Sequence, residues 1–581
     1  MSHTLNHLLE TIRIFYITIS IQLNLIEKYI YLILQSYLTF WSSPWLNLIN
    51  FIILLLIIWI ILDYNGFQRP EPIENIIQIP GYPIVGNLFQ ILLNPAQTYL
   101  RWSQEYNTPI FQIRLGIKNV IIVNSFKDVY SLWIKHSCAN NSRPTSYTFH
   151  GIVSSTQGFT VGSTPAGSSY KVKKKVIAQY LHHKAIDEVK WLIDDESKYM
   201  IRKVIGNNYE ISGPPSSYMH GHMRSELSDI DLMEPLQLFD LRSSIILAYG
   251  ITLDCYNNDK EFSDEIIDVE NQIIQLRSPV GNLQDFLPIL RYLPFKNNLA
   301  AQLRQRRDKY MNKLMSILES KLKDGDPTAI ESIVGRIKLN QDLVPVNEEQ
   351  LHSICLTLVS AGLDNTPLNF NHLIGHFSQP GYGQALQEKA YNKILELSNN
   401  DLLLAWNEAV DTKCDYLMAL IHESLRFFTV LPLALPRITT KPINYNQGEI
   451  IIPPNTILFM NAYAANHDPK QFEDPYKFEP ERWLDPNGKL KITNELSHFA
   501  FGAGSRMCSG NVLAIQGIYT LMCRMILYFK IKPPIKDLME LDPFKNNSNP
   551  RATSFEPKVF KIRLEPRNHM DQDKLYQKIM S

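Results

Sequence analysis

One cysteine in a glycine-rich loop is the residue of this sequence best suited to bind a metal ion. Cys508 lies in the stretch "FAFGAGSRMCSGN", and the long apolar run after it predicts a buried helix that begins at the cysteine. The backbone N–H groups and the dipole at a helix N-terminus stabilise a thiolate, so we expect a lowered pKa for Cys508. A thiolate of this kind is a good metal ligand.

The surroundings of Cys508 in the sequence indicate which metal group it would bind. Neither a CxxC motif nor a neighbouring histidine accompanies the cysteine, so a tetrahedral zinc site cannot be completed. Haem already supplies four nitrogen ligands to its iron and needs one axial ligand from the protein. The sequence therefore predicts haem (iron protoporphyrin IX), with Cys508 as the axial ligand of its iron.

The residues around Cys508 form the pattern Phe-x-x-Gly-x-Arg-x-Cys-x-Gly, in which the sequence resembles the cytochrome P450 family of haem-thiolate monooxygenases. The resemblance implies haem-binding roles for several of these residues. Arg506 would pair with a haem propionate, and Phe501 would pack beside the sulfur and limit its access to water. Gly502 would allow a positive φ in a tight loop, and Gly510 would let the helix backbone approach the porphyrin.

Two charged motifs strengthen the resemblance. Glu423 and Arg426 are three residues apart in "LIHESLRFF", so they share one face of a helix whose apolar neighbours predict burial. Arg482 follows in "PERWL", and the family joins this arginine to the earlier pair. The resemblance implies that these three residues are a scaffold for the haem loop and not catalysts.

Another motif resembles the helix that crosses the oxygen-binding face of haem in this family. That helix usually carries Ala-Gly-x-Asp/Glu-Thr, and here the stretch is "LVSAGLDNTPLNF". Asp364 matches the motif, but Asn365 stands in place of the usual threonine and Thr366 follows it, about 100° further around an ideal helix. Pro367 is expected to kink the helix. Either the kink turns Thr366 toward the oxygen, or Asn365 holds the water that relays protons.

Two further positions resemble haem contacts of the family. Arg437 follows "LPLALP", from which family members commonly bind a propionate. Tyr170 and Lys174 in "SSYKVKKKV" stand where members often have tryptophan and arginine, so Lys174 would contact haem without the two-pronged geometry of a guanidinium. An alternative is that residues 171–175 form a basic face that docks an acidic electron donor.

The elements that must position these residues are mostly helical. Apolar positions at helical spacing dominate from the end of the strand-like stretches "IFQIRLG" and "NVIIVNS" to about residue 425. The stretch "INYNQGEIIIPPNTILFM" predicts a small hairpin folded around "PPN", and a polar segment from Ser212 predicts a surface loop. We therefore expect a mainly α fold with a small β portion, the cytochrome P450 fold.

An apolar run from Trp45 to Leu62 predicts a transmembrane helix ahead of this body, because about 20 residues at 1.5 Å each cover a hydrocarbon core of roughly 30 Å. We expect residues 1–66 to form a membrane-anchor region and residues 67–581 to form the haem domain. The segment before residue 45 is apolar with polar interruptions, so it either lies along the interface or spans the membrane too. The few flanking basic residues leave the side of the N-terminus undecided.

Composition limits the partners. Lysine plus arginine and aspartate plus glutamate both number 57, so no net charge draws nucleic acid to the chain. The six scattered cysteines are typical of a reducing compartment. Because the sequence has no flavin or nicotinamide motif, the resemblance implies a separate electron donor, NADPH-cytochrome P450 reductase, on the same membrane. We expect the membrane to be the endoplasmic reticulum, with the haem domain in the cytosol.

Several segments spread over the body, among them "LAYGITLD" and "IIQLRSPVGNLQDFLPILR", resemble fungal phenylacetate hydroxylases in particular. This implies an enzyme that inserts one oxygen atom of O2 into a small organic substrate, with ring hydroxylation of phenylacetate or a related aromatic acid as the expected reaction. A carboxylate substrate would need a cation in an otherwise apolar pocket. The sequence does not identify this cation, and Arg277 is one candidate.

Three alternatives stay open. The departure at Asn365 is compatible with a haem-thiolate isomerase or dehydratase that does not use O2. The substrate is alternatively a fatty acid or a sterol, or the chain binds haem without catalysis. Reductase-dependent turnover and a screen of substrate classes discriminate among these alternatives.

Overall fold

The computed structural model describes residues 28–32, 35, 44–64, 71–212, 229–278, 281–292, 298–340, 346–493 and 496–580. The chain divides into two compact units, residues 1–69 and residues 70–581. The polar segment predicted to form a surface loop after Ser212 lies outside the described residues, as does most of the apolar segment before residue 44.

The first unit contains helix α2 (Pro44–Tyr64), which covers the run predicted to be a transmembrane helix. Large apolar side chains of α2, such as Leu48 and Phe51, are each about half exposed. Within the described residues, the helix that is long and apolar enough to span a bilayer is α19 (Asn511–Tyr528), and 72% of it is buried inside the protein. Helix α19 is therefore a core helix of the second unit, and the role of α2 as a membrane span stays a prediction.

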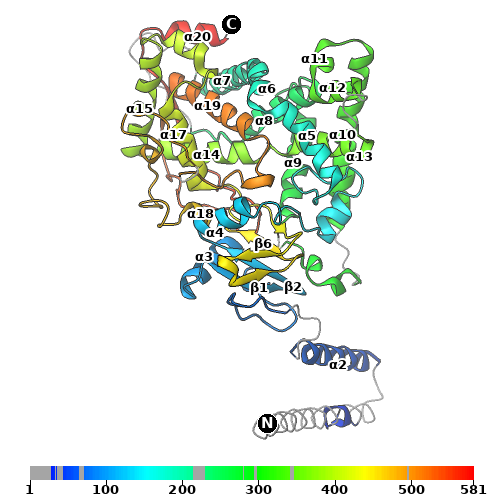
Figure 1. Ribbon diagram of the computed structural model, residues 1–581. Coiled ribbons are helices and arrows are strands. Elements are labelled where there is room, and N and C mark those ends of the chain that lie inside the picture. Colours follow the sequence, from blue (N-terminus) through cyan, green and yellow to red (C-terminus); the bar gives the residue numbers. More distant parts are fainter. Residues whose placement is uncertain are drawn as a thin grey trace. The chain divides into compact units, whose positions relative to one another are not determined.

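The second unit is built mainly from helices, as predicted (Figure 1). Its α-helices are α3 (Pro95–Glu105), α4 (Phe126–Val129), α5 (Ser168–Leu181), α6 (His183–Glu188), α7 (Lys190–Ser212), α8 (Met233–Tyr249), α9 (Lys260–Gln275), α10 (Asn298–Lys323), α11 (Pro327–Glu331), α12 (Ile333–Leu339), α13 (Glu348–Ser360), α14 (Asn365–Ser378), α15 (Tyr382–Leu397), α16 (Leu402–Asn407), α17 (Asp415–Phe428), α18 (Ala462–Asn466), α19 and α20 (Gln572–Met580). Shorter 3₁₀ and π turns lie at Tyr130–Lys135, Tyr147–Val153, Leu283–Asp285, Pro288–Tyr292, Glu408–Val410, Asn446–Gly448, Pro480–Trp483 and Gly504–Arg506.

Three small sheets complete the second unit. The largest has the strand order β1-β2-β6-β3, formed by β1 (Ile110–Leu115), β2 (Lys118–Val123), β6 (Ile457–Met460) and β3 (Arg437–Ile438). Strand β2 pairs with β1 antiparallel and with β6 in parallel, so a segment near residue 120 lies beside one near residue 458. The other two sheets pair β4 (Ile443–Tyr445) with β5 (Ile450–Ile452), and β7 (Phe529–Lys532) with β8 (Arg563–Pro566).

A hairpin forms in the predicted segment, but the prediction that its turn lies at "PPN" is wrong. The tight turn lies at Asn446–Gly448, between β4 and β5, while Pro453, Pro454 and Asn455 connect β5 to β6 in a different sheet. Gln447 and Gly448 have φ angles of 58° and 93°, and a tight turn of this kind needs residues that accept positive φ.

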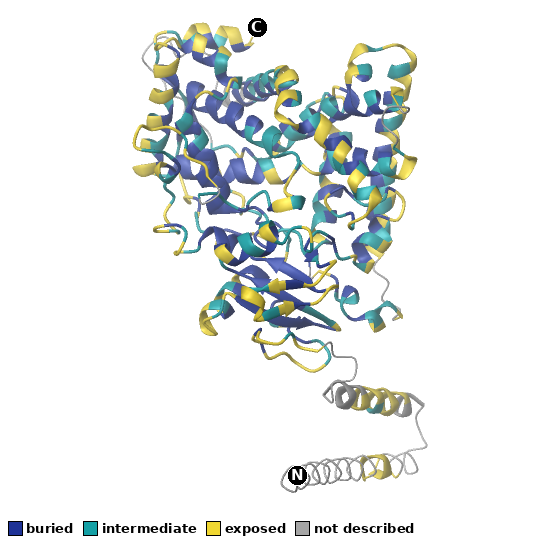
Figure 2. Ribbon diagram, viewed as in Figure 1, coloured by how far each residue is buried: buried dark blue, intermediate teal, exposed yellow. Residues whose placement is uncertain are grey.

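The interior of the second unit is formed by the central helices and by the sheet, which Figure 2 shows in dark blue. Nearly every residue of α17 from Tyr416 to Phe428 is buried, and α19 packs against α7, α15 and α17. A helix that is buried on most of its faces has a rigid position. These two helices therefore form a fixed support for the loops at their ends.

The kink predicted at Pro367 is a break in the helix a few residues earlier. Helix α13 ends at Ser360 and α14 begins at Asn365, with turn residues between them. Pro367 lies in the first turn of α14, where a missing backbone N–H leaves no hydrogen bond unmade.

Candidate active site

The structure places all ten predicted site residues on the lining of one cavity of about 390 Å³. They come from α5, from the break between α13 and α14, from the first turn of α14, from β3 and from the loop before α19, and are Lys174, Asp364, Asn365, Thr366, Arg437, Phe501, Gly502, Arg506, Cys508 and Gly510. Residues almost 340 positions apart in the sequence thus meet at one site.

The loop that carries Cys508 is closed by its own backbone. The Cys508 N–H donates to the Phe501 carbonyl oxygen at 2.9 Å, and Gly502 and Gly504 have φ angles of 70° and 58°. A Cβ atom at Gly504 would overlap the carbonyl oxygen of Trp133, so that position accepts only glycine. The predicted need for positive φ in this loop is confirmed.

The prediction of a lowered pKa for Cys508 is wrong when only the groups of the protein itself act on the thiol. The side chain is accessible in the cavity but lies deep in the body, and this loss of solvation raises the pKa of the thiol, while a hydrogen bond from Gly510 lowers it in part. Helix α19 begins at Asn511, three residues after the cysteine, so the end of the helix is further from the sulfur than the sequence suggested. A thiolate at this position would therefore need much of its stabilisation from a bound cation.

Three buried arginines face the cavity, and one of them, Arg143, was not predicted. Each donates to backbone carbonyl oxygens: Arg506 Nη1 to Thr164 at 2.8 Å, Arg437 Nη1 to Asn140 at 3.0 Å, and Arg143 Nη1 to Leu435 at 2.7 Å. Arg143 lies in "NNSRPTS", where neither spacing nor motif distinguishes it. Only the fold, which places this loop against β3, identifies Arg143 as part of the cluster.

The charges of this cluster are not balanced by the groups that hold it. Burial and then the neighbouring Arg506 lower the pKa of Arg143 to about 9, and burial followed by Arg143 and Arg506 lowers the pKa of Arg437 to about 8. Arg506 Nη2 is buried without a hydrogen-bond partner among the described residues. Three positive charges close together in a cavity need an anion, and a group with two carboxylates, as haem has, fits them.

Lys174 and Tyr170 support the Cys508 loop. The hydroxyl of Tyr170 donates to the Ser505 carbonyl oxygen at 3.1 Å, and the ammonium of Lys174 donates to the same oxygen. The guanidinium carbon of Arg506 lies 3.3 Å from the centre of the Tyr170 ring. Lys174 therefore contacts the loop directly, and its predicted contact with haem stays a prediction.

The predicted oxygen-side residues lie at the break between α13 and α14. Burial, and then the carboxylates of Glu556 and Glu270, raise the pKa of Asp364 to about 7. The Asn365 side-chain amide donates to the Ala361 carbonyl oxygen at 3.2 Å, which caps the broken helix. The side-chain amide of Asn365 is therefore already hydrogen-bonded to the backbone.

Thr366 contacts an acid that sequence reasoning missed. Its hydroxyl forms a hydrogen bond with Asp240 of α8, and burial raises the pKa of Asp240 well above its ordinary value. Asp240 lines the same cavity as Cys508, and its Oδ2 has no hydrogen-bond partner within the described part of the chain. The one sequence signal for Asp240 is an acidic residue inside the apolar stretch "LQLFDL".

The comparisons with known proteins agree with this geometry. The sequence model of the family described as Cytochrome P450 matches residues 78–555, most of the second unit. The chain belongs to the cytochrome P450 family. It is therefore a haem-binding monooxygenase that acts with O2 on an organic substrate.

Three curated relatives cover most of this P450. Phenylacetate 2-hydroxylase of Emericella nidulans is 37% identical over 516 residues, which are 88% of this chain and 94% of the relative. The 3-hydroxyphenylacetate 6-hydroxylase of the same organism is 35% identical over 508 residues, 87% and 90% of the two chains. A cytochrome P450 monooxygenase of Mycosarcoma maydis is 32% identical over 513 residues, 86% and 89% of the two chains.

The charged triad predicted for this P450 forms a buried network. Glu423 is fully buried and accepts hydrogen bonds from Arg426 Nη2 at 2.8 Å, Arg482 Nε at 3.2 Å and Trp483 Nε1 at 2.9 Å. The backbone N–H of Glu479 donates to it at 2.8 Å. This network joins α17 to the segment of residues 479–483 and is a structural support.

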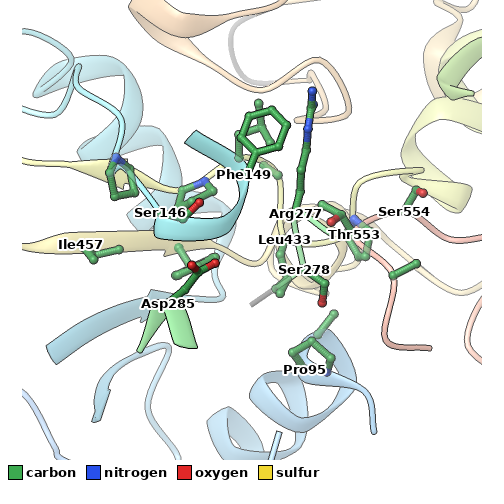
Figure 3. A pocket seen from close by; sticks show the side chains of 18 of the residues that line it. Pro95, Ser146, Phe149, Arg277, Ser278, Asp285, Leu433, Ile457, Thr553 and Ser554 are labelled. Carbon is green, nitrogen blue, oxygen red and sulfur yellow. The ribbon is translucent and has the colours of Figure 1, made fainter. Parts of the chain in front are cut away.

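A second, smaller cavity of about 140 Å³ adjoins the first (Figure 3). Its lining is mostly apolar, with Phe149 and Leu433 among the side chains shown. The two cavities share six lining residues, which are Arg143, Arg277, Ala434, Leu435, Thr553 and Ser554. A ligand at this boundary is in contact with the space that Cys508 lines.

Proposed function

We propose that this P450 hydroxylates the aromatic ring of phenylacetate or a closely related small aromatic acid. The observation that carries the proposal is the small apolar cavity beside the Cys508 cavity, with the cation of Arg277 at the boundary of the two. The names of the two Emericella nidulans relatives, both hydroxylases of phenylacetates, support the same class of substrate.

The size and polarity of this space favour an aromatic acid over the larger alternatives. Sites for drug-sized ligands usually enclose about 300–1,000 Å³, and the cavity of Figure 3 encloses about 140 Å³. A sterol or a long fatty acid would need more room than this cavity gives and would have to extend into the adjoining cavity that Cys508 lines. An apolar lining with one cation suits a small ring that bears a carboxylate.

The haem-binding roles belong to this proposal. When bound, haem supplies the iron at which O2 is held and reduced. Cys508 would bind the iron from the loop before α19, and Phe501 and Gly502 would shape the surroundings of the sulfur. The arginines at 143, 437 and 506 would hold the propionates.

The proton-delivery roles fall to the residues at the helix break. Asp364, with a pKa of about 7, can hold and release a proton near neutral pH. The hydroxyl of Thr366 is hydrogen-bonded with the buried carboxyl of Asp240. The site therefore contains a paired acid and hydroxyl, although Asn365 replaces the usual threonine. This pairing favours a monooxygenase over an isomerase or dehydratase that needs no protons for O2.

The electron donor and the membrane are further parts of the proposal. Electrons would come from NADPH-cytochrome P450 reductase, and Lys171 and Lys175 on the exposed face of α5 offer a basic surface to it. Residues 1–66, with α2, would anchor the haem domain of residues 67–581 to the endoplasmic reticulum on its cytosolic side.

A binding screen tests the proposed substrate. Purified full-length holoprotein is titrated with arylacetic acids, fatty acids and sterols, and the spin-state change of the haem absorption is recorded. We expect a saturable change with phenylacetates, followed by ring-hydroxylated product when NADPH and reductase are added. A change with fatty acids or sterols and none with arylacetic acids would refute the proposal.

A further inference from the structure

Arg277 lies between the two cavities, just after the end of α9 at Gln275. Figure 3 shows its side chain beside Phe149, above Ser278 and near Thr553. The guanidinium carbon lies 4.4 Å from the centre of the Phe149 ring. A guanidinium stacked on an aromatic ring is held in a fixed orientation while its N–H groups stay free to donate.

The charge of Arg277 is incompletely compensated by the protein. Its Nε is buried and has no hydrogen-bond partner among the described residues. The nearby Glu270 carboxylate accepts hydrogen bonds from Arg307 at 2.5 and 2.7 Å and from Tyr310 at 2.6 Å, and so it is already occupied. Asp364 attracts Arg277, but burial keeps that carboxyl partly protonated near neutral pH.

Arg277 nevertheless stays a cation. Burial and then the repulsion from Arg307 lower the pKa of Arg277 to about 10, which leaves the guanidinium protonated at neutral pH. A buried cation without a paired anion costs free energy, and an anionic ligand would recover it. The site is therefore suited to a carboxylate.

The other basic groups of the smaller cavity are less suited to this role. Lys118 is attracted by Asp285, which lines the same cavity. Burial lowers the pKa of His150 to about 4, so its ring is neutral. Arg143 donates to three backbone carbonyl oxygens, at 2.7, 2.8 and 2.9 Å, and is part of the arginine cluster next to the Cys508 loop.

We infer that Arg277 binds the carboxylate of the aromatic-acid substrate and directs its ring toward the cavity that Cys508 lines. The inference rests on the proposed function, because it requires an acidic aromatic substrate. It makes Arg277 the residue that distinguishes an arylacetate from a neutral compound of the same shape. Loss of this cation should weaken binding of the acid and leave binding of a neutral analogue nearly unchanged.

The test compares two ligands on matched variants of the full-length holoprotein. Dissociation constants for phenylacetate and for phenylacetamide, its neutral analogue, are measured by equilibrium dialysis in the wild type, Arg277→Gln and Arg277→Lys. We expect Arg277→Gln to weaken phenylacetate binding roughly 10- to 100-fold, the size of a lost charge-assisted contact. We expect phenylacetamide to change less than about threefold, and Arg277→Lys to lie between the wild type and Arg277→Gln for phenylacetate.

The matched control is Arg291→Gln. Arg291 also lies over an aromatic ring, with its guanidinium carbon 4.5 Å from the centre of the Tyr147 ring, but it does not line either cavity. We expect this variant to bind both ligands as the wild type does. Carbon monoxide difference spectra of all variants report whether the haem site is folded.

Four outcomes would overturn the inference. Equal affinity of the wild type for phenylacetate and phenylacetamide would do so without any variant, and so would an equal loss of both ligands in a folded Arg277→Gln protein. Unchanged phenylacetate binding in Arg277→Gln would refute the role of Arg277 while the proposed function stands. If the wild type binds no arylacetic acid but does bind a fatty acid or a sterol, the proposed function and the inference both fail.

Discussion

At the scale of single residues, the site combines a thiol of raised pKa with an excess of buried positive charge. The protein groups around Cys508 stabilise its thiolate only weakly, because burial raises the pKa of this thiol. Arg437 and Arg506 repel each other where no carboxylate of the described residues balances them. Both features are what we expect if a bound group supplies a metal cation for the sulfur and anions for the arginines.

Replacement of Cys508 tests directly whether its sulfur binds the metal of such a group. Cys508→Ser removes the sulfur donor, and we expect the red-shifted carbon monoxide difference absorption of the reduced protein to disappear. Cys138→Ser is the control, because Cys138 is exposed and does not line the cavity. A red-shifted absorption that persists in Cys508→Ser would show that another ligand binds the iron.

The proton path is tested by two neighbouring substitutions. Thr366 is hydrogen-bonded with the buried Asp240, whereas the Asn365 amide donates to the Ala361 carbonyl oxygen. We therefore expect Thr366→Val to raise peroxide release per NADPH roughly tenfold, and Asn365→Ala to raise it less than about twofold. The reverse order would assign the relay to Asn365. Peroxide, NADPH and product are quantified in the same reaction.

The buried Asp364 predicts a dependence of stability on pH. Its pKa is about 7 in the folded chain against 3.8 for a free side chain, so stability falls as the pH rises between these values. At about 1.4 kcal/mol for each pKa unit, the ionised carboxylate lowers the free energy of unfolding by up to about 4 kcal/mol above neutral pH.

The substitution Asp364→Asn removes this titration. We expect the variant to melt at a higher temperature than the wild type at about pH 8.5, and the difference to fall to less than about half at about pH 5, where Asp364 is protonated when folded but still ionised when unfolded. Melting curves of both holoproteins over this pH range provide the measurement. A difference that is independent of pH would show that Asp364 does not titrate in this range.

At the scale of elements, helices α17 and α19 hold the chemistry in place. The loop of Cys508 lies directly before α19, and the buried Glu423 network fastens α17 to the segment of residues 479–483. The carboxylate of Glu423 receives five hydrogen bonds, four from three side chains and one from a backbone N–H, and so its charge is paired. Loss of that charge leaves two arginines without their partner.

We expect Glu423→Gln to lower the free energy of unfolding by about 3 kcal/mol, the size of the penalty for breaking a buried ion pair. The control is Glu396→Gln, which removes an exposed ion pair with Lys393 at 2.7 Å and should leave the free energy of unfolding nearly unchanged. Urea unfolding and haem retention are followed for both. Equal effects of the two substitutions would contradict a structural role for the network.

At the scale of the whole molecule, the haem domain and the N-terminal region are separate units. Most apolar side chains of α2 between Leu48 and Ile58 are exposed, as we expect for a helix that would lie in lipid. The second unit carries every residue that lines the Cys508 cavity. Anchoring and chemistry are therefore expected to be separable.

Deletion of residues 1–66 tests this separation. We expect the shortened chain to leave the membrane fraction for the soluble fraction while it keeps the carbon monoxide difference spectrum of the full chain. Fractionation of cell lysates, with the spectrum measured in each fraction, provides the measurement. Retention of the shortened chain by membranes would show that the haem domain itself binds lipid.

The features of this protein that depend on local pattern were predictable from its sequence. The glycines at 502 and 504, the pair Glu423 and Arg426, and the apolar run of α2 are each recognisable within a short window, because backbone geometry, helical spacing and bilayer thickness act locally. The mainly helical fold with small sheets followed from the same kind of pattern.

Which charged groups meet depends on the fold and not on local pattern. Arg143, Asp240 and Arg277 belong to ordinary stretches of sequence, and they become parts of the site because the fold buries them around two adjoining cavities. In the folded chain the pKa of Cys508 is raised and not lowered, and the helix breaks before Pro367 and not at it. Desolvation and Coulomb interactions depend on what surrounds a group in space, and those neighbours come from segments hundreds of residues apart.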